Sequence, residues 1–132
     1  MTDDADGAVA EVRAVYDRLM NAFVAGDAEG YFSCFHEDAS FYFAGDPLLE
    51  PRSAYEAAWK TWEREGIPFT DVVADDLRIR VFGSTAVLTH TVGPAGTIDG
   101  EQTAGRERES IVFARIDGRW IAVHEHLSSD ES

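Results

Sequence analysis

The sequence predicts an α+β protein in which helices pack on one face of a curved antiparallel sheet. Apolar residues recur at helical spacing up to Glu65, and they alternate with polar residues from Asp71 onward. Helices that precede a run of strands favour this arrangement over repeating strand–helix–strand units. The 132 residues are enough for one domain with a buried core. We expect a disordered acidic N-terminus over residues 1–7, the domain over 8–128 and a loose tail over 129–132.

Three helices are predicted in the first half of the chain. From Ala8 to Val24 the large apolar residues lie mostly three or four positions apart, which is typical of a helix with one buried face. Asp6 is the expected N-cap of this helix, and Asp27 is the expected N-cap of a short second helix. A third helix is predicted after Pro51 and ends at Glu65, with two tryptophans on one face that need to be buried.

Strands are predicted wherever apolar and polar residues alternate between turn residues. A short aromatic strand is expected at Ser40 to Ala44, after a turn at His36 to Asp38. Two hairpins follow, and they turn at Gly83-Ser84 and Asp117-Gly118. Their strands are predicted at Asp71 to Phe82, Thr85 to Val92, Gln102 to Ile116 and Arg119 to Leu127.

The chain is strongly acidic, with 11 Lys and Arg against 25 Asp and Glu and a net charge of −14. This charge repels phosphate backbones and anionic lipids, so we expect neither a nucleic-acid nor a membrane partner. Cys34 is the only cysteine, and the N-terminus lacks the features of a signal peptide. These observations predict a cytoplasmic protein.

Two strings resemble the nuclear transport factor 2-like superfamily, and in particular its SnoaL-like branch. Residues 21–31 resemble the end of its first helix, the Gly-Asp cap and the second helix, and residues 117–128 resemble its closing strand. Arg108-Glu109-Ser110 stands where the branch carries Arg-x-Thr. The resemblance implies a cone-shaped fold, a pocket between the helices and the concave sheet face, and a homodimer formed through the outer sheet face. Fold alone does not imply one function, because this superfamily includes ketosteroid isomerases, scytalone dehydratase and non-enzymatic binding modules.

The pairing of the last hairpin predicts a cluster of ionisable side chains. Counting back from the Asp117-Gly118 turn without interruption places Ile111 opposite His124 and Glu109 opposite His126. A carboxylate beside an imidazole can orient it and raise its pKa, as general acid–base catalysis requires. His126, Glu109 and His124 are therefore the candidate catalytic residues. The alternative is an ordinary polar pair across two strands.

The same count in the first hairpin places Leu77 opposite His90, on an apolar face. His90 is either a core residue or part of the cavity wall, and convergence with His124 and His126 would suggest a metal site, although we predict no metal and no cofactor. The other candidate wall residues are aromatic or apolar, and the alternative for each is that it belongs to the plain core. The predicted pocket residues are Tyr16, Met20, Tyr42, Trp59, His90, Ile111, Phe113 and Trp120.

Polar groups clustered among aromatic side chains favour a pocket for a small molecule. The sequence is compatible with a cofactor-independent isomerase, dehydratase or cyclase that acts on a small apolar carbonyl or hydroxy compound. It is also compatible with a non-catalytic ligand-binding, accessory or assembly module of the same fold. Because Glu109 is the acid expected in the pocket, we expect a neutral or cationic ligand rather than an anion.

Overall fold

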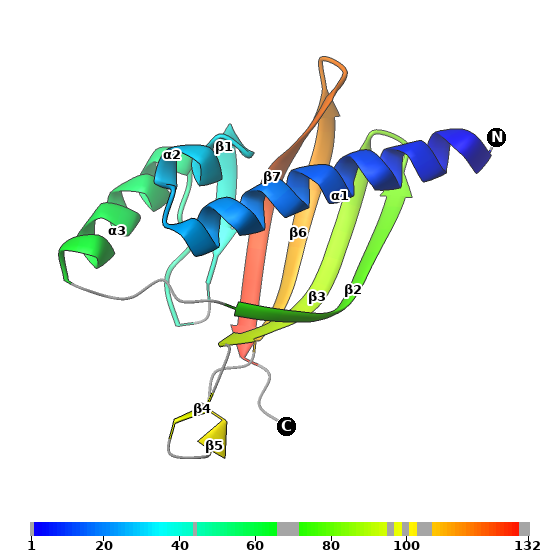
Figure 1. Cartoon of the computed structure of the whole chain (residues 1–132). Coiled ribbons are helices and arrows are strands. Elements are labelled where there is room, and N and C mark those ends of the chain that lie inside the picture. Colours follow the sequence, from blue (N-terminus) through cyan, green and yellow to red (C-terminus); the bar gives the residue numbers. More distant parts are fainter. Residues whose placement is uncertain are drawn as a thin grey trace.

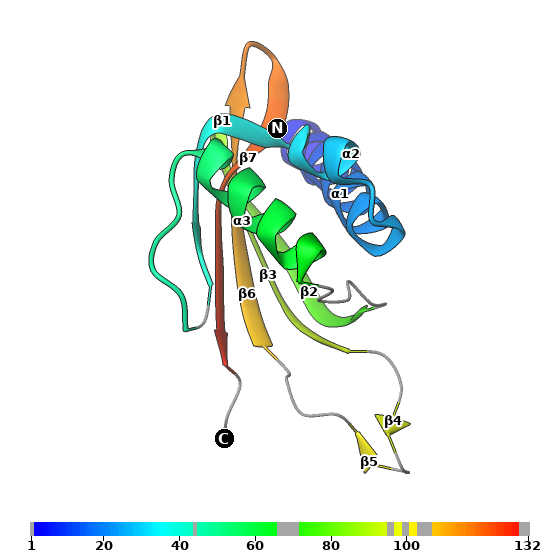
Figure 2. The same cartoon turned by 90° about the vertical axis from the view of Figure 1, so that its left-hand side faces the viewer.

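The chain folds into a curved sheet with its helices packed on one side (Figures 1 and 2). The structure is a computed structural model that describes residues 2–43, 45–65, 72–94, 97–98, 101–102 and 107–129. The helices are α1 (Thr2–Ala25), α2 (Ala28–Phe32) and α3 (Arg52–Arg64). The strands of the main sheet are β1 (Phe35–Tyr42), β2 (Val72–Phe82), β3 (Thr85–Pro94), β6 (Glu107–Ile116) and β7 (Arg119–Ser129). Two short strands, β4 (Thr97–Ile98) and β5 (Glu101–Gln102), pair separately.

The main sheet has the strand order β1-β7-β6-β3-β2 and is mixed rather than purely antiparallel. The two predicted hairpins are confirmed, and β3 pairs antiparallel with β6 between them. β1, in contrast, runs parallel to β7. The α+β architecture is therefore as predicted, and the parallel edge strand is the difference.

β1 begins at Phe35, so the turn predicted at His36 to Asp38 is wrong. Phe35 and Ala39 are both buried, whereas Glu37 and Asp38 between them are exposed. The register to β7 shifts between Phe35 and Ser40. The polar residues thus lie in an irregular part of one strand, where extra residues can bulge outward while the apolar ones stay inside.

The helices largely match their predicted bounds. Asp27 caps α2, because its side chain accepts a hydrogen bond from the backbone N–H of Gly30 at 3.1 Å. α3 buries Tyr55 and Trp59 toward the sheet. α1 begins at Thr2, earlier than the predicted start at Ala8. No helix within the described residues is long and apolar enough to cross a membrane.

The inner face of the sheet is apolar at one end and acidic at the other. On β6, Phe113 and Ile111 are fully buried, and the next inward residue is Glu109. On β3, Ala86 and Leu88 are likewise buried and are followed by His90. The alternation of each strand thus continues the core directly into a polar region beneath the helices.

Candidate functional site

A cavity of about 360 Å³ lies between the helices and the polar end of the inner sheet face. Its helical side is apolar and aromatic, and includes Leu19, Met20, Phe23, Tyr31, Tyr55 and Trp62. Its sheet side includes Glu107, Glu109, Glu125, Val92 and Leu127, and Phe43 and Asp46 follow β1 at its edge. A largely apolar cleft or cavity with a few convergent polar groups is the usual form of a small-molecule site.

Glu109 is held from behind by a histidine and a tyrosine. His90 on β3 faces Glu109 on β6 across the sheet, and its Nε2 is hydrogen-bonded to Glu109 Oε1. The His90 Nδ1 lies 3.0 Å from the hydroxyl of Tyr16 on α1, and the Tyr16 ring meets the His90 ring edge-on. All three side chains are buried, with 4% of His90 and 7% of Glu109 exposed. The two linked hydrogen bonds, from Tyr16 to His90 and from His90 to Glu109, therefore fix the orientation of the carboxyl group that lines the cavity.

A second buried carboxyl group, that of Glu125, lies beside Glu109. Glu125 is 3% exposed, and its Oε1 accepts a hydrogen bond from the Tyr31 hydroxyl at 3.4 Å. The Tyr31 hydroxyl in turn lies 3.0 Å from that of Tyr55. Because Tyr31 lies on the Asp27-capped helix α2 and Tyr55 on α3, both helices contribute to this end of the site.

Burial sets the protonation of the two acids. It raises the pKa of Glu109 to about 7, although a hydrogen bond from Glu125 partly opposes this shift. Burial and the neighbouring Glu109 charge raise the pKa of Glu125 well above its ordinary value. Glu125 therefore keeps its proton at neutral pH and donates it to the Glu109 carboxylate, so the two groups act as a coupled pair.

His90 and Tyr16 stay neutral beside this pair. Burial lowers the pKa of His90 to about 4, and burial with the Glu109 charge raises the pKa of Tyr16 to about 12. A neutral imidazole has one N–H. When Glu109 is ionised, His90 Nε2 donates to it and Tyr16 donates to Nδ1; when Glu109 is protonated, both hydrogen bonds can reverse. Glu109 can therefore gain or lose a proton without movement of heavy atoms.

Comparison with known proteins identifies the family. The model of the SnoaL-like domain matches residues 12–130, which is most of the chain. This chain belongs to the SnoaL-like family. Among proteins with curated descriptions, none matches it.

Solved structures with low sequence identity share the fold of this SnoaL-like chain. An NTF2-like protein of unknown function from Pseudomonas putida KT2440 is 24% identical with a TM-score of 0.78, and the match covers 97% of this chain and 90% of that one. A proposed dehydratase of the NTF2-like family from Streptomyces avermitilis is 20% identical with a TM-score of 0.79, covering 96% and 99%. A protein of unknown function from Mycobacterium tuberculosis is 22% identical with a TM-score of 0.79, covering 99% and 76%.

The predicted pairing of Glu109 with His126 is wrong because β7 contains a bulge. The pairs from Ile116–Arg119 to Phe113–Ala122 are as predicted, but Val112 then pairs with His124, which leaves Val123 as an extra residue. One extra residue moves every later side chain to the opposite face. Glu125 consequently lies on the inner face, where a histidine was expected.

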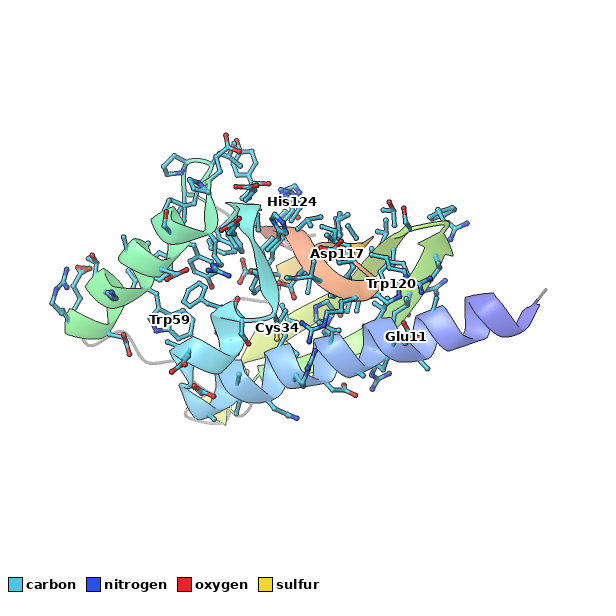
Figure 3. All side chains as sticks on the ribbon, turned by 90° about the horizontal axis from the view of Figure 1, so that it is seen from above. Glu11, Cys34, Trp59, Asp117, Trp120 and His124 are labelled. Carbon is cyan, nitrogen blue, oxygen red and sulfur yellow. The ribbon has the colours of Figure 1, made fainter. Side chains whose placement is uncertain are left out.

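His124 and His126 lie on the outer face of the SnoaL-like sheet. The His124 Nδ1 is 2.8 Å from the Ser40 hydroxyl, and the His126 ring stacks on Tyr42 with centroids 5.6 Å apart. Figure 3 shows His124 on the side of the sheet away from α1. The three histidines therefore do not converge, because His90 faces inward. Across the described part of the chain, no three His, Cys, Asp or Glu side chains are grouped to hold a metal ion.

The predicted pocket residues lie in four different places. Met20 lines the cavity, and Tyr16, His90, Ile111 and Phe113 are buried on or against the same sheet face. Trp59 is a core residue under α3 that is 1% exposed. Trp120 lines a separate groove that also includes Glu11 and Cys34, near α1 (Figure 3). Tyr42 lies on the outer face and is 49% exposed.

Glu125 and Tyr31 are two hydrogen-bonding residues of the site that sequence reasoning did not identify. The apolar inward positions on β7 are Trp120 and Ala122 before the bulge and Leu127 after it. This change from even to odd positions is the signal of the bulge, because an uninterrupted strand keeps one parity on each face. The sequence predicts Tyr31 on the correct helix, but nothing local indicates that its hydroxyl reaches β7.

Proposed function

We propose that this SnoaL-like protein is a cofactor-independent acid–base catalyst that acts on a small carbonyl or hydroxy compound, as a dehydratase or an isomerase. One observation carries the proposal: Glu109 lines the cavity as a buried carboxyl group with a pKa of about 7. A general base is most effective when its pKa is close to the working pH. Perturbed carboxyl groups in a cavity are also typical of catalytic sites.

The pair of acids supplies both proton transfers of a dehydration. The Glu109 carboxylate accepts a proton from the carbon next to a carbonyl group, while Glu125 donates its proton to the leaving hydroxyl group, which departs as water. The C–H electron pair forms the new double bond. The proton on Glu109 then passes to Glu125 through their shared hydrogen bond, which restores both groups. In an isomerisation, Glu109 instead returns the proton to a different carbon.

The location of the two acids implies that both act on the same face of the substrate. β6 and β7 are neighbouring strands, and Glu109 and Glu125 both point from them into the same cavity. The proton and the hydroxyl group would therefore leave from the same side of the substrate. The proposed dehydratase from Streptomyces avermitilis is consistent with this reaction class, although at 20% identity it supports only the shared fold.

A non-catalytic ligand-binding protein is the second candidate. The observation that favours it is the largely aromatic wall on the helical side, which would bind a ring compound without any reaction. The two candidates differ in one respect. A binding protein would leave the C–H bonds of its ligand intact, whereas a base at Glu109 would exchange the hydrogen next to the carbonyl group with solvent hydrogen.

Hydrogen–deuterium exchange tests the proposal. The protein would be incubated in D2O with 2-tetralone, 3-cyclohexen-1-one and 3-hydroxycyclohexanone, and deuterium incorporation, isomerisation and loss of water would be followed by NMR. We expect catalysis of at least one of these processes, with kcat/KM rising with pH through about 7 because Glu109 must be ionised. Glu109→Gln should lower the rate at least 100-fold, as loss of a general base typically does.

Glu37→Gln is the matched control, because it removes one carboxylate from an exposed position of β1. It should leave the rate unchanged. Saturable binding of these compounds with no exchange above the background rate at any pH would instead support the binding protein.

A further inference from the structure

The cavity is acidic in a way that catalysis alone does not require. Glu107, Glu109, Glu125 and Asp46 all line it, and among its described lining residues there is no Lys, Arg or His. Three arginines pair with acids outside the cavity lining: Arg13 with Asp17, Arg52 with Glu56 and Arg78 with Asp76. None of these three arginines therefore neutralises an acid of the cavity.

The two innermost acids are surrounded by neutral hydrogen-bonding groups. Glu109 contacts His90, which stays neutral, and accepts a hydrogen bond from protonated Glu125, which in turn contacts the Tyr31 hydroxyl. Each carboxyl group is more than nine-tenths buried. A carboxylate in such a position is stabilised strongly by a positive charge within a few ångströms. Nothing in the described cavity supplies that charge, so a ligand is its natural source.

The opposite wall is suited to the same kind of ligand. Five aromatic residues line the cavity, namely Phe23, Tyr31, Phe43, Tyr55 and Trp62. The faces of aromatic rings attract organic cations, and Trp does so most strongly. Aromatic rings facing buried carboxylates form a recognised arrangement for protonated and quaternary amines. The cavity volume of about 360 Å³ suits a compound of about one or two rings, near the low end of the range for small-molecule sites.

We propose that the ligand of this cavity is a small ring compound that carries a protonated or quaternary amine, with its nitrogen beside Glu109 and Glu125 and its ring against the aromatic wall. The inference uses the cavity of the proposed function but does not rest on turnover. It specifies the charge of the substrate, which the acid–base reaction leaves open. If the protein is a catalyst, the same amine would place the reacting carbon near Glu109.

Binding of a cation is coupled to the proton of Glu109. The ionisable groups around Glu109 are His90 from β3, Glu125 from β7, Glu107 on β6, and Tyr16, Tyr31 and Tyr55 from the helices. Of these, the tyrosines stay protonated and His90 stays neutral between pH 6 and 8. An ammonium group favours the ionised carboxylate, so its affinity rises with pH and its binding releases protons.

Calorimetric titration with three compounds of similar size tests the inference. The probes are 2-phenylethylammonium, 2-phenylethanol and phenylacetate, and the first stays protonated between pH 6 and 8. At pH 8 we expect the ammonium to bind at least tenfold more tightly than the alcohol and phenylacetate not to bind. The affinity of the ammonium should fall about tenfold from pH 8 to pH 6, because a pKa of about 7 changes the ionised fraction by that factor. Its binding enthalpy should depend on the buffer, which reports proton release.

Variants locate the binding site. Glu109→Gln removes the ionised carboxylate and should weaken binding of the ammonium at least tenfold, whereas Glu125→Gln replaces a group that keeps its proton and should weaken it less. Both variants should leave binding of the alcohol nearly unchanged, and Glu37→Gln should change the binding of neither probe. Because the ranking of the three probes is measured on the unmodified protein, the test does not depend on whether a variant folds. Equal or tighter binding of the alcohol or phenylacetate, or no binding of the ammonium at millimolar concentration, would overturn the inference. Selective ammonium binding without deuterium exchange would leave the inference standing and contradict the catalytic proposal.

Discussion

At the scale of single residues, the site shows how neighbours give chemically identical side chains different roles. Glu109 and Glu125 are both buried on adjacent strands, but His90 donates to the first and Tyr31 to the second. The first is half ionised near pH 7, and the second keeps its proton. Exposed acids such as Glu37 lack these constraints. Burial and hydrogen bonding, rather than residue type, distinguish the site from the many acids on the surface.

These buried acids should make the protein less stable as the pH rises. A carboxyl group whose folded pKa lies above its unfolded value binds more protons when folded, so its stabilisation is lost as pH rises from the unfolded toward the folded pKa. For Glu109 this window runs from 4.5 to about 7, and the raised pKa of Glu125 acts in the same direction. The pKa of His90 is lowered from 6.5 to about 4, which makes the protein more stable as the pH rises. This effect is complete by pH 6.5, so it does not oppose the loss above that pH. We expect the free energy of unfolding to fall by roughly 1 to 3 kcal/mol between pH 6.5 and 8.5.

Urea denaturation followed by circular dichroism at pH 6.5, 7.5 and 8.5 measures this slope. Glu125→Gln should flatten it, because the amide keeps the shape and hydrogen bonding of the protonated acid but cannot ionise. Glu37→Gln, which removes an exposed acid, should leave the slope as in the unmodified protein. A stability that rises over this pH range would contradict the assigned protonation states.

At the scale of secondary-structure elements, short α2 depends on its cap to place Tyr31. A helix of this length gains little from its own hydrogen bonds, so its N-cap matters. Asp27→Ala removes the hydrogen bond to Gly30 and should cost about 1 kcal/mol of stability. Asp27→Asn keeps a capping oxygen, so its free energy of unfolding should stay within about a few tenths of a kcal/mol of that of the unmodified protein. Urea denaturation of both variants measures the difference, and equal losses would show that the cap is not the cause.

The helices and hairpins could be predicted from the sequence because their signals are local. The α2 cap, the apolar face of α3 and the turn at Asp117-Gly118 each depend on residues close in the chain. The candidate site depended on register, and a single bulged residue, Val123, reversed the faces of the last part of β7. Bulges are stabilised by packing across the sheet. Here the pairing of β1 with β7 is also irregular, between Ala122 and His124. That information is not local, so the sequence predicts Glu109 in the pocket but with the wrong partners.

At the scale of the whole molecule, the charge of −14 is unevenly distributed. The outer sheet face carries Arg78 and Arg80 on β2, Arg108 on β6 and His124 and His126 on β7. Between them lie uncharged residues such as Thr89 and Val112. Exposed Tyr42 and Phe82 lie at the two edges of this sheet. An acidic protein repels its own copies least through a face that has few acids and some apolar surface.

We therefore predict that the protein forms a homodimer through the outer sheet face. In a two-fold dimer each substitution occurs twice, so two new carboxylates near the centre of the interface would repel each other in a poorly hydrated place. Thr89 is exposed on β3, and Thr89→Glu should halve the mass measured by light scattering at micromolar concentration while the circular dichroism spectrum stays unchanged. Thr61→Glu places the same charge on the exposed side of α3 and should leave the mass that of a dimer. A monomeric mass for the unmodified protein, or the same mass for both variants, would show that this face is not the interface.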